Sequence, residues 1–215
     1  MALLVRKYKL ADRVALDRIA ADTAFFGEPV EAFLGDRRLF CDAFYAYYTD
    51  LEPEHSWVAC VGQEVVGFLV GCVDTKLQQR RWARRVLPSV AWRAFRGQYR
   101  LGWTTVRYTA RLAQSYLRGE FASVDLGAYP AHLHINVDKR WRGRGTGRRL
   151  MEAYLDQLRR SQVPGVHLNT TSLNEAACRL YEKVGFRLLD ARATRVWLHL
   201  VDRPVESRCY GLRLA

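Results

Sequence analysis

Two histidines stand two positions apart in an alternating segment, His132-Leu133-His134-Ile135-Asn136-Val137. Such alternation predicts a β-strand, and residues two apart on a strand point to the same face. An imidazole with a pKa of about 6.5 is mostly neutral at pH 7, so His132 and His134 are candidate general bases. The alternative is a pair of structural histidines that hydrogen-bond inside the face of a sheet.

A turn rich in glycine and arginine follows, Arg142-Gly143-Arg144-Gly145-Thr146-Gly147, and an amphipathic pattern from Gly145 to Gln162 predicts a helix. Glycines let a backbone approach a phosphate closely, and the amides at a helix N-terminus attract anions. The side chains of Arg142, Arg144 and Arg148 would add charge-assisted hydrogen bonds. The turn therefore predicts a pyrophosphate site, with a solvated glycine-rich turn as the alternative.

The turn fits neither of two common nucleotide motifs. It lacks the Gly-Lys-Ser/Thr ending of a nucleotide P-loop, and no acidic residue stands at a strand end about 20 residues later, as a dinucleotide site requires.

A second block lies on the next expected helix, which ends near Val184: Asn174-x-x-Ala177-x-x-x-Tyr181-x-x-x-Gly185-Phe186. Together the two blocks make residues 131–190 resemble the GNAT (Gcn5-related N-acetyltransferase) superfamily.

This resemblance implies an α+β fold with α/β/α layers: a mixed, mostly antiparallel GNAT-type sheet of about seven strands flanked by helices. It implies acetyl-CoA as cosubstrate and no metal ion. In the family, the arginine–glycine turn holds the CoA pyrophosphate, the strand before it pairs with the pantetheine, and the Asn and Tyr of the later helix meet the cofactor arm and its sulfur. The cofactor-binding residues carried over are Ile135, Asn136, Val137, Arg142, Gly143, Arg144, Gly145, Thr146, Gly147, Arg148, Asn174, Ala177 and Tyr181.

The implied reaction is direct attack of a primary amine of a small acceptor on acetyl-CoA in a ternary complex. An amine with a pKa of about 10.4 is only about one part in a thousand neutral near pH 7.4, a deficit of about 4 kcal/mol. His132 or His134 would take the proton, and Tyr181 would hydrogen-bond the leaving sulfur. The His-x-His strand is similar to that of arylalkylamine N-acetyltransferases and to the acetyltransferase-like domain of O-GlcNAcase relatives. The second likeness leaves a non-catalytic, CoA-binding module open.

Positive charge is concentrated in one segment. The 215 residues carry a formal net charge of +12, and residues 76–118 hold Lys76 and ten arginines without one acidic residue. We expect a single domain, 1–215, in which 76–119 is a basic, aromatic-rich, mainly helical insertion. Its favoured role is a cap or lid. Docking on a membrane surface or on nucleic acid is the alternative, and either would suit a non-catalytic module.

Further expectations concern the surroundings of the site. The apolar runs 55–61 and 64–73 predict a hairpin, Ser172 with Glu175 predicts a capping box, and residues 196–201 predict a strand. Five scattered cysteines indicate reduced thiols, and no apolar stretch is long enough to span a membrane, so we expect a cytoplasmic protein. The late strands with residues 209–212 could supply the surface of a homodimer.

Overall fold

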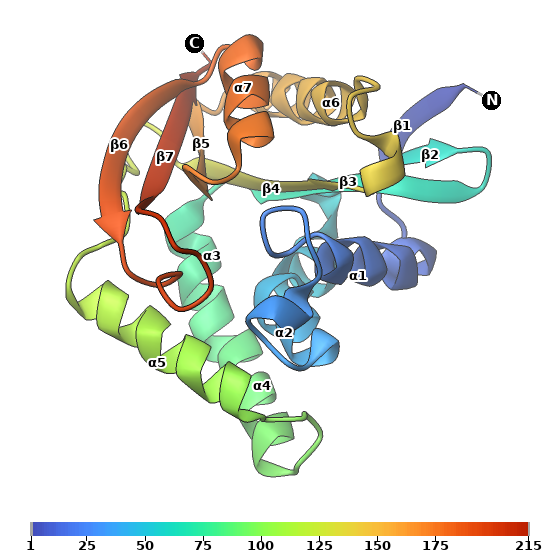
Figure 1. The fold of residues 1–215 in the computed structure, drawn as a ribbon. Coiled ribbons are helices and arrows are strands. Elements are labelled where there is room, and N and C mark those ends of the chain that lie inside the picture. The colour runs from blue at the N-terminus through green and yellow to red at the C-terminus, as the bar shows by residue number, and fades with distance from the viewer. Residues whose placement is uncertain (1, 215) are drawn as a thin grey trace.

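Seven strands form one sheet in the computed structural model, which describes residues 2–214 (Figure 1). Their order is β1-β2-β3-β4-β5-β7-β6, and every neighbouring pair is antiparallel except β4 and β5. The mixed, mostly antiparallel sheet predicted from the sequence is therefore confirmed. The strands are β1 (Leu3–Lys7), β2 (Trp57–Val61), β3 (Glu64–Cys72), β4 (Ala131–Val137), β5 (Gly165–Thr171), β6 (Arg187–Thr194) and β7 (Val205–Arg213).

Helices cover both faces of the sheet (Figure 1). On one face, α6 (Thr146–Arg160) and α7 (Glu175–Val184) bury their apolar sides in a core that includes Leu150, Tyr154 and Tyr181. On the other face, α1 (Arg13–Asp22) and α2 (Arg37–Phe44) close a second core. The short 3-10 and π turns are Leu10–Asp12, Val30–Ala32, Tyr47–Leu51, Pro53–His55, Trp82–Val86 and Lys139–Trp141.

The basic segment forms three further helices on the side of α1 and α2 (Figure 1). They are α3 (Thr75–Arg81), α4 (Leu87–Phe95) and α5 (Trp103–Leu117). The segment is anchored by its aromatic side chains: Trp82 donates a hydrogen bond to the carbonyl of Ala43, and Tyr108 packs on Phe33. Within residues 2–214, no helix is both long and apolar enough to cross a membrane.

The parallel pair β4–β5 separates almost as soon as it forms. Its register contains only Ala131 with Val166 and His132 with His167. On its other edge, β4 stays paired with β3 as far as Val137. The second half of β4 therefore leaves its backbone groups on the β5 side free, along one wall of an opening in the sheet.

The prediction of a strand at residues 196–201 is wrong. Residues 196–200 form turns, in which Val196 is buried and Trp197 packs against the rings of Phe33 and Tyr108. The apolar pattern there reflects a loop that closes a core, not a strand face. The last strand is β7, whose residues 209–211 are paired on both edges, so they offer no free strand edge to a second copy.

The capping box predicted at Ser172 and Glu175 does not form either. Asn174 precedes α7, and the Ser172 hydroxyl instead accepts a hydrogen bond from the amide of Glu206 at 3.0 Å. That bond ties the loop before α7 to β7. The predicted hairpin and the helix after the glycine turn are both present, as β2–β3 and as α6.

Candidate active site

A cavity of about 480 Å³ lies beside the free edge of β4, between the start of α6 and α7. Every cofactor-binding residue predicted from the sequence lines it except Arg144, whose guanidinium lies 4.9 Å from the centre of the Trp141 ring. The cavity is referred to below as the cofactor cleft. Its lining is Thr23, Gly27, Ile135, Asn136, Val137, Trp141, Arg142, Gly143, Gly145, Thr146, Gly147, Arg148, Asn174, Ala176, Ala177, Arg179, Leu180, Tyr181 and Lys183.

Two glycines shape the turn between β4 and α6. Gly143 and Gly145 have φ of +72° and +80°, a conformation that other residues rarely adopt. Apart from the adjacent residues of the chain, no atom lies within 4 Å of the point where a Cβ would stand at either position. The first hydrogen bond of α6 runs from the amide of Arg149 to the carbonyl of Gly145. The amides of residues 146–148 therefore have no carbonyl acceptor within the helix. An anion in the cleft would meet these amides and the positive end of the helix.

Contacts within the protein orient two arginines at the cleft, Arg142 in the turn and Arg148 in α6. Arg142 donates from Nε to the carbonyl of Val137 at 3.1 Å, and no carboxylate in residues 2–214 pairs with it. Arg148 is held by Glu152, with 2.8 Å between Nε and Oε1. Arg142 therefore presents an uncompensated guanidinium in the cleft.

A smaller cavity of about 230 Å³ adjoins the cofactor cleft and shares Thr23, Ile135, Asn136, Asn174 and Tyr181 with it. We name it the acceptor cavity, after the role proposed for it. Five phenylalanine, tyrosine or tryptophan rings and the amides and hydroxyls of β5 make up much of its wall, and none of its lining residues is Asp, Glu, Lys or Arg. The lining that is not shared is Ala24, Phe26, Phe40, Tyr45, Leu133, His134, Asn169, Thr170, Thr171 and Trp197.

Tyr48 joins the two histidines of β4. Its hydroxyl lies 2.5 Å from Nε2 of His132 and 3.2 Å from Nε2 of His134. The other ring nitrogen of His132 lies 2.7 Å from the hydroxyl of Thr75, and that hydroxyl donates to the carbonyl of Pro130, also at 2.7 Å. These groups form a continuous chain from the acceptor cavity, at His134, into the core.

The chain of hydrogen bonds assigns the proton positions. Because Thr75 donates to Pro130, its oxygen accepts from Nδ1–H of His132, and Nε2 of His132 then accepts from the hydroxyl of Tyr48. The Tyr48 oxygen in turn accepts from Nε2–H of His134, which leaves Nδ1 of His134 with its lone pair. Both nitrogens of His132 are engaged, so the network leaves one imidazole nitrogen available as a base.

Burial sets the charge of these groups. Loss of solvation, with the neighbouring histidines as a second cause, holds the pKa of His132 well below its usual 6.5. The same effects lower the pKa of His134 to about 4, although solvent reaches its ring. Burial raises the pKa of Tyr48 and of Tyr181 above 10. Near pH 7 both imidazoles are therefore neutral and both phenols keep their protons.

Tyr181 lies where the two cavities meet. Its side chain is 6% exposed, and no hydrogen-bond partner for its hydroxyl is found within the described part of the chain. Cys178, one turn earlier, packs in the core, and His167 bonds the carbonyl of Tyr129 at 2.9 Å. Tyr181 is thus a proton donor still free for a ligand, while Cys178 and His167 have structural partners.

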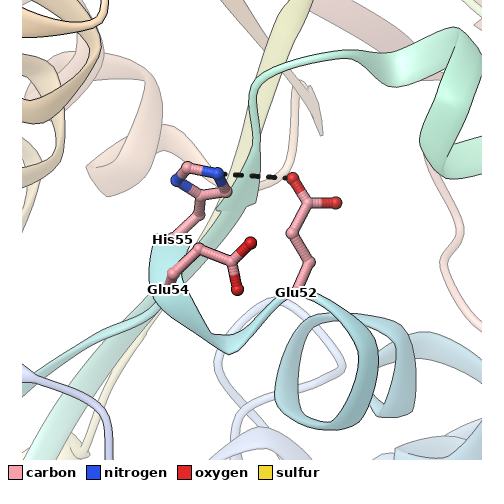
Figure 2. Close-up of side chains that lie close together, drawn as sticks. All are labelled: Glu52, Glu54 and His55. Carbon is pink, nitrogen blue, oxygen red and sulfur yellow. Dashed lines mark ion pairs between the residues drawn. The ribbon is translucent and has the colours of Figure 1, made fainter.

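Glu52, Glu54 and His55 also lie close together, with their ligand atoms within 4.8 Å of one another (Figure 2). Each buried atom already has a partner: Nδ1 of His55 lies 2.7 Å from the Gln157 side-chain nitrogen, and Glu52 accepts from the hydroxyl of Tyr47. Nε2 of His55 lies 3.5 Å from Glu52 (Figure 2). These contacts account for the cluster, which lines neither cavity.

Sequence reasoning missed Tyr48, Thr75 and the aromatic wall of the acceptor cavity. Tyr48 reaches the histidines from 84 positions away along the chain. Tyr48 is buried, and in the sequence nothing distinguishes it from an ordinary core residue. No spacing in the sequence connects it with His132 or His134.

Comparison with known proteins agrees with this geometry. Residues 25–186 match the acetyltransferase (GNAT) family. A solved structure described as SsHAT is 31% identical and aligns over 100% of both chains with a TM-score of 0.77. The structure of yncA, a putative acetyltransferase from Salmonella typhimurium with its cofactor acetyl-CoA, covers 100% of this chain and 95% of that chain. Its TM-score is 0.58 at 15% identity, a likeness of fold alone.

A sequence relative gives a shorter match. The chain is 48% identical over 56 residues to the mycothiol acetyltransferase of Nocardiopsis dassonvillei. The match takes in 26% of this chain and 17% of that protein, so it spans about a sixth of the relative's length. The family match, which covers most of the chain, decides the assignment: the chain belongs to the GNAT family of acetyltransferases.

Proposed function

We propose that the chain transfers the acetyl group of acetyl-CoA to a primary amine of a small acceptor, by direct attack in a ternary complex. The observation that carries the proposal is that the cofactor cleft and the acceptor cavity meet at Thr23, Ile135, Asn136, Asn174 and Tyr181. A thioester at this junction is open to an amine from the acceptor side. The reaction then needs no nucleophile of the protein.

The cofactor cleft supplies the binding half of the proposal. The free amides of residues 146–148 and the guanidinium of Arg142 would hold the pyrophosphate. The free edge of β4 would pair with the amides of the pantetheine arm, and an amide of Ile135 or Val137 would polarise the thioester carbonyl. This assigns one chemical role to each part of the cleft.

His134 is the base in this proposal, and His132 with Tyr48 positions it. Nδ1 of His134 carries the available lone pair, because its Nε2 is bonded to Tyr48. As the new N–C bond forms, the attacking nitrogen becomes cationic and its protons become strongly acidic. A neutral imidazole of low pKa can therefore accept one of them at that stage.

Tyr181 completes the transfer at the leaving group. When the C–S bond breaks, the electron pair stays on sulfur, and the Tyr181 hydroxyl donates a hydrogen bond to the thiolate. Burial raises the pKa of this phenol, so it stabilises the thiolate without giving up its proton, and solvent protonates the sulfur afterwards. This assigns Tyr181 a hydrogen-bonding role, not that of a general acid.

The acceptor cavity favours a small monoamine. Its volume is about 230 Å³: the rings of Phe26, Phe40 and Trp197 suit an aryl or alkyl group, and the amides and hydroxyls of β5 suit a hydrogen-bonding group on the same acceptor. No carboxylate lines the cavity, so a second ammonium group would find no counter-charge there. Polyamines are the disfavoured class.

Thiol release from acetyl-CoA, measured against a panel of amines, tests the proposal. We expect turnover with aryl- or alkylamines, and no acetylated protein by mass spectrometry when acetyl-CoA is present alone. Tyr181→Phe should lower kcat about tenfold, the effect of losing one hydrogen bond. Binding of acetyl-CoA without turnover of any amine would overturn the proposal in favour of a non-catalytic CoA-binding module.

A further inference from the structure

The segment 76–118 carries positive charge that the protein does not neutralise. It supplies eleven of the twelve net charges of the chain. Within residues 2–214, only Arg93 and Arg118 of its eleven cations lie within 4 Å of a carboxylate, on Asp42 and Glu120. The other nine are Lys76, Arg80, Arg81, Arg84, Arg85, Arg96, Arg100, Arg107 and Arg111. Charge of one sign, left unpaired over consecutive helices, favours an external anionic surface.

Helix α5 has one buried side and one exposed side that is apolar. Thr105, Tyr108 and Ser115 are buried against the rest of the protein. On the opposite side, a stripe at helical spacing faces solvent: Trp103, Val106, Ala110, Ala113 and Leu117. Its large members are 75%, 47% and 86% exposed at Trp103, Val106 and Leu117. Nothing in the described chain covers this stripe.

The end of α4 and the turn that joins it to α5 continue the exposed apolar surface. Phe95 is 83% exposed and Trp92 57%, with their rings stacked at 5.8 Å, and Leu101 follows at 51%. Arg96 lies over the ring of Trp92 at 5.4 Å. Figure 1 shows this turn at the end of the molecule opposite the sheet, where it can reach a flat partner before the rest of the protein does.

We propose that the hairpin of α4 and α5, residues 87–117, docks on a membrane surface that contains anionic lipids. Exposed Trp, Phe and Leu side chains would enter the interface between headgroups and acyl chains, and the unpaired arginines would bind the headgroups. No insertion residue lines either cavity, so docking would leave the cofactor cleft and the acceptor cavity accessible.

Two other partners fit the same surface less well. A second copy of the chain would bring arginines against arginines, because neither copy has an acidic residue between 76 and 118. Nucleic acid would satisfy the arginines and stack on the tryptophans. It would not cover Leu101, Val106 and Leu117, because aliphatic side chains do not stack on bases.

Flotation of the full chain with vesicles tests the proposal, using phosphatidylcholine with or without about one third phosphatidylglycerol. We expect flotation with the anionic vesicles alone. The apolar variant, Trp92→Ser with Phe95→Ser and Trp103→Ser, should lower partitioning more than tenfold. The charge variant, Arg96→Glu with Arg100→Glu and Arg107→Glu, should lower it about fivefold or more per arginine, since each arginine near an anionic surface is worth about 1 kcal/mol.

Two control variants place substitutions of the same kinds, two in each, on exposed residues outside the hairpin. Leu10→Ser with Val14→Ser, at positions 76% and 81% exposed, and Arg187→Glu with Arg203→Glu should float like the wild type. Circular dichroism and the affinity for CoA verify the fold of each variant. Absence of flotation, equal flotation with neutral vesicles, or a loss in the controls equal to that in the variants would overturn the proposal. So would tighter binding of a DNA duplex at the same salt, or a dimer that the apolar variant dissolves.

Discussion

The cofactor cleft and the acceptor cavity are neighbours that the chain builds in different ways. All residues that line the cleft except Thr23 and Gly27 fall between positions 135 and 183. The acceptor cavity is assembled from separate parts of the chain, at 23–26, 40–45, 133–136, 169–174, 181 and 197. The cleft is thus largely a local structure of consecutive elements, whereas the cavity is a tertiary meeting point.

This difference follows from what each site must recognise. A pyrophosphate is held by backbone amides and a helix N-terminus, which depend on a fixed spacing of glycines such as Gly143 and Gly145. A small amine is held by side chains, which separate loops and helices can supply. The cleft is therefore tied to a motif, while the cavity can change its ligand through residues such as Phe26 or Trp197 without disturbing the motif.

His134→Ala should separate the two sites most strongly. If His134 is the base, its loss lowers kcat by about 10²- to 10⁴-fold, the usual range for general-base catalysis, and leaves the affinity for acetyl-CoA unchanged. Steady-state kinetics together with calorimetry of CoA binding measures both. His55→Gln, which changes a histidine outside both cavities, should keep wild-type kinetics. A comparable loss of CoA affinity in His134→Ala would show that the two sites are not separable.

Tyr48→Phe sharpens the same comparison, because it keeps the ring and removes only the hydroxyl between the histidines. A positioning role predicts a fall in kcat of about tenfold, smaller than that of His134→Ala. Stability alone does not explain such a fall if the thermal midpoint and the CoA affinity of the variant match the wild type. Wild-type kcat in Tyr48→Phe would remove Tyr48 from the mechanism.

The two sites also differ in how far the sequence predicts them. The turn at 142–147, the helix after it and the block at 174–181 are local patterns, and the structure brings them together around one cavity. Tyr48 and Thr75 approach His132 only because separate elements pack on one face of the sheet, and single-sequence spacing carries no such information. The turns at 196–200 have the apolar pattern of a strand because Val196 is buried and Trp197 packs, half-buried, against the core.

Arg142→Ala should affect the cofactor cleft alone. It removes a guanidinium that has no carboxylate partner and lines the cleft. Loss of charge-assisted hydrogen bonds worth about 1.5–3 kcal/mol should raise the Kd for CoA about 10- to 100-fold, with kcat at saturating acetyl-CoA within about twofold of wild type. Arg149→Ala is the matched control, since Arg149 donates to the carbonyl of Leu3 at 3.0 Å and does not line the cleft. Equal effects of the two changes would contradict a specific site at Arg142.

Replacing His132 should change the pH dependence of the free energy of unfolding and leave cofactor binding unchanged. Its pKa is lowered in the folded protein, so below about pH 6.5 the unfolded chain binds a proton that the folded chain does not. The free energy of unfolding must then fall as the pH falls, by up to about 1.4 kcal/mol per pH unit for this group. Urea unfolding between pH 7 and 5 should show a shallower pH slope in His132→Gln than in the wild type. A variant that is merely less stable at every pH, with an unchanged slope, would contradict a neutral buried His132.

The smallest expected effect is on the pH dependence of the reaction itself. A histidine base with an ordinary pKa would lose activity as the pH falls through about 6.5. Because the pKa of His134 is lowered to about 4, the base stays neutral over that range, and only the acceptor amine changes its protonation. The value of kcat/KM, expressed per neutral amine, should therefore vary less than about twofold between pH 6 and 8. The contrary result is a fall in kcat/KM centred near pH 6.5 that is absent in His134→Ala. It would mean that solvent in the acceptor cavity restores the ordinary pKa of this imidazole. The acceptor cavity would then be far more open than the cofactor cleft beside it.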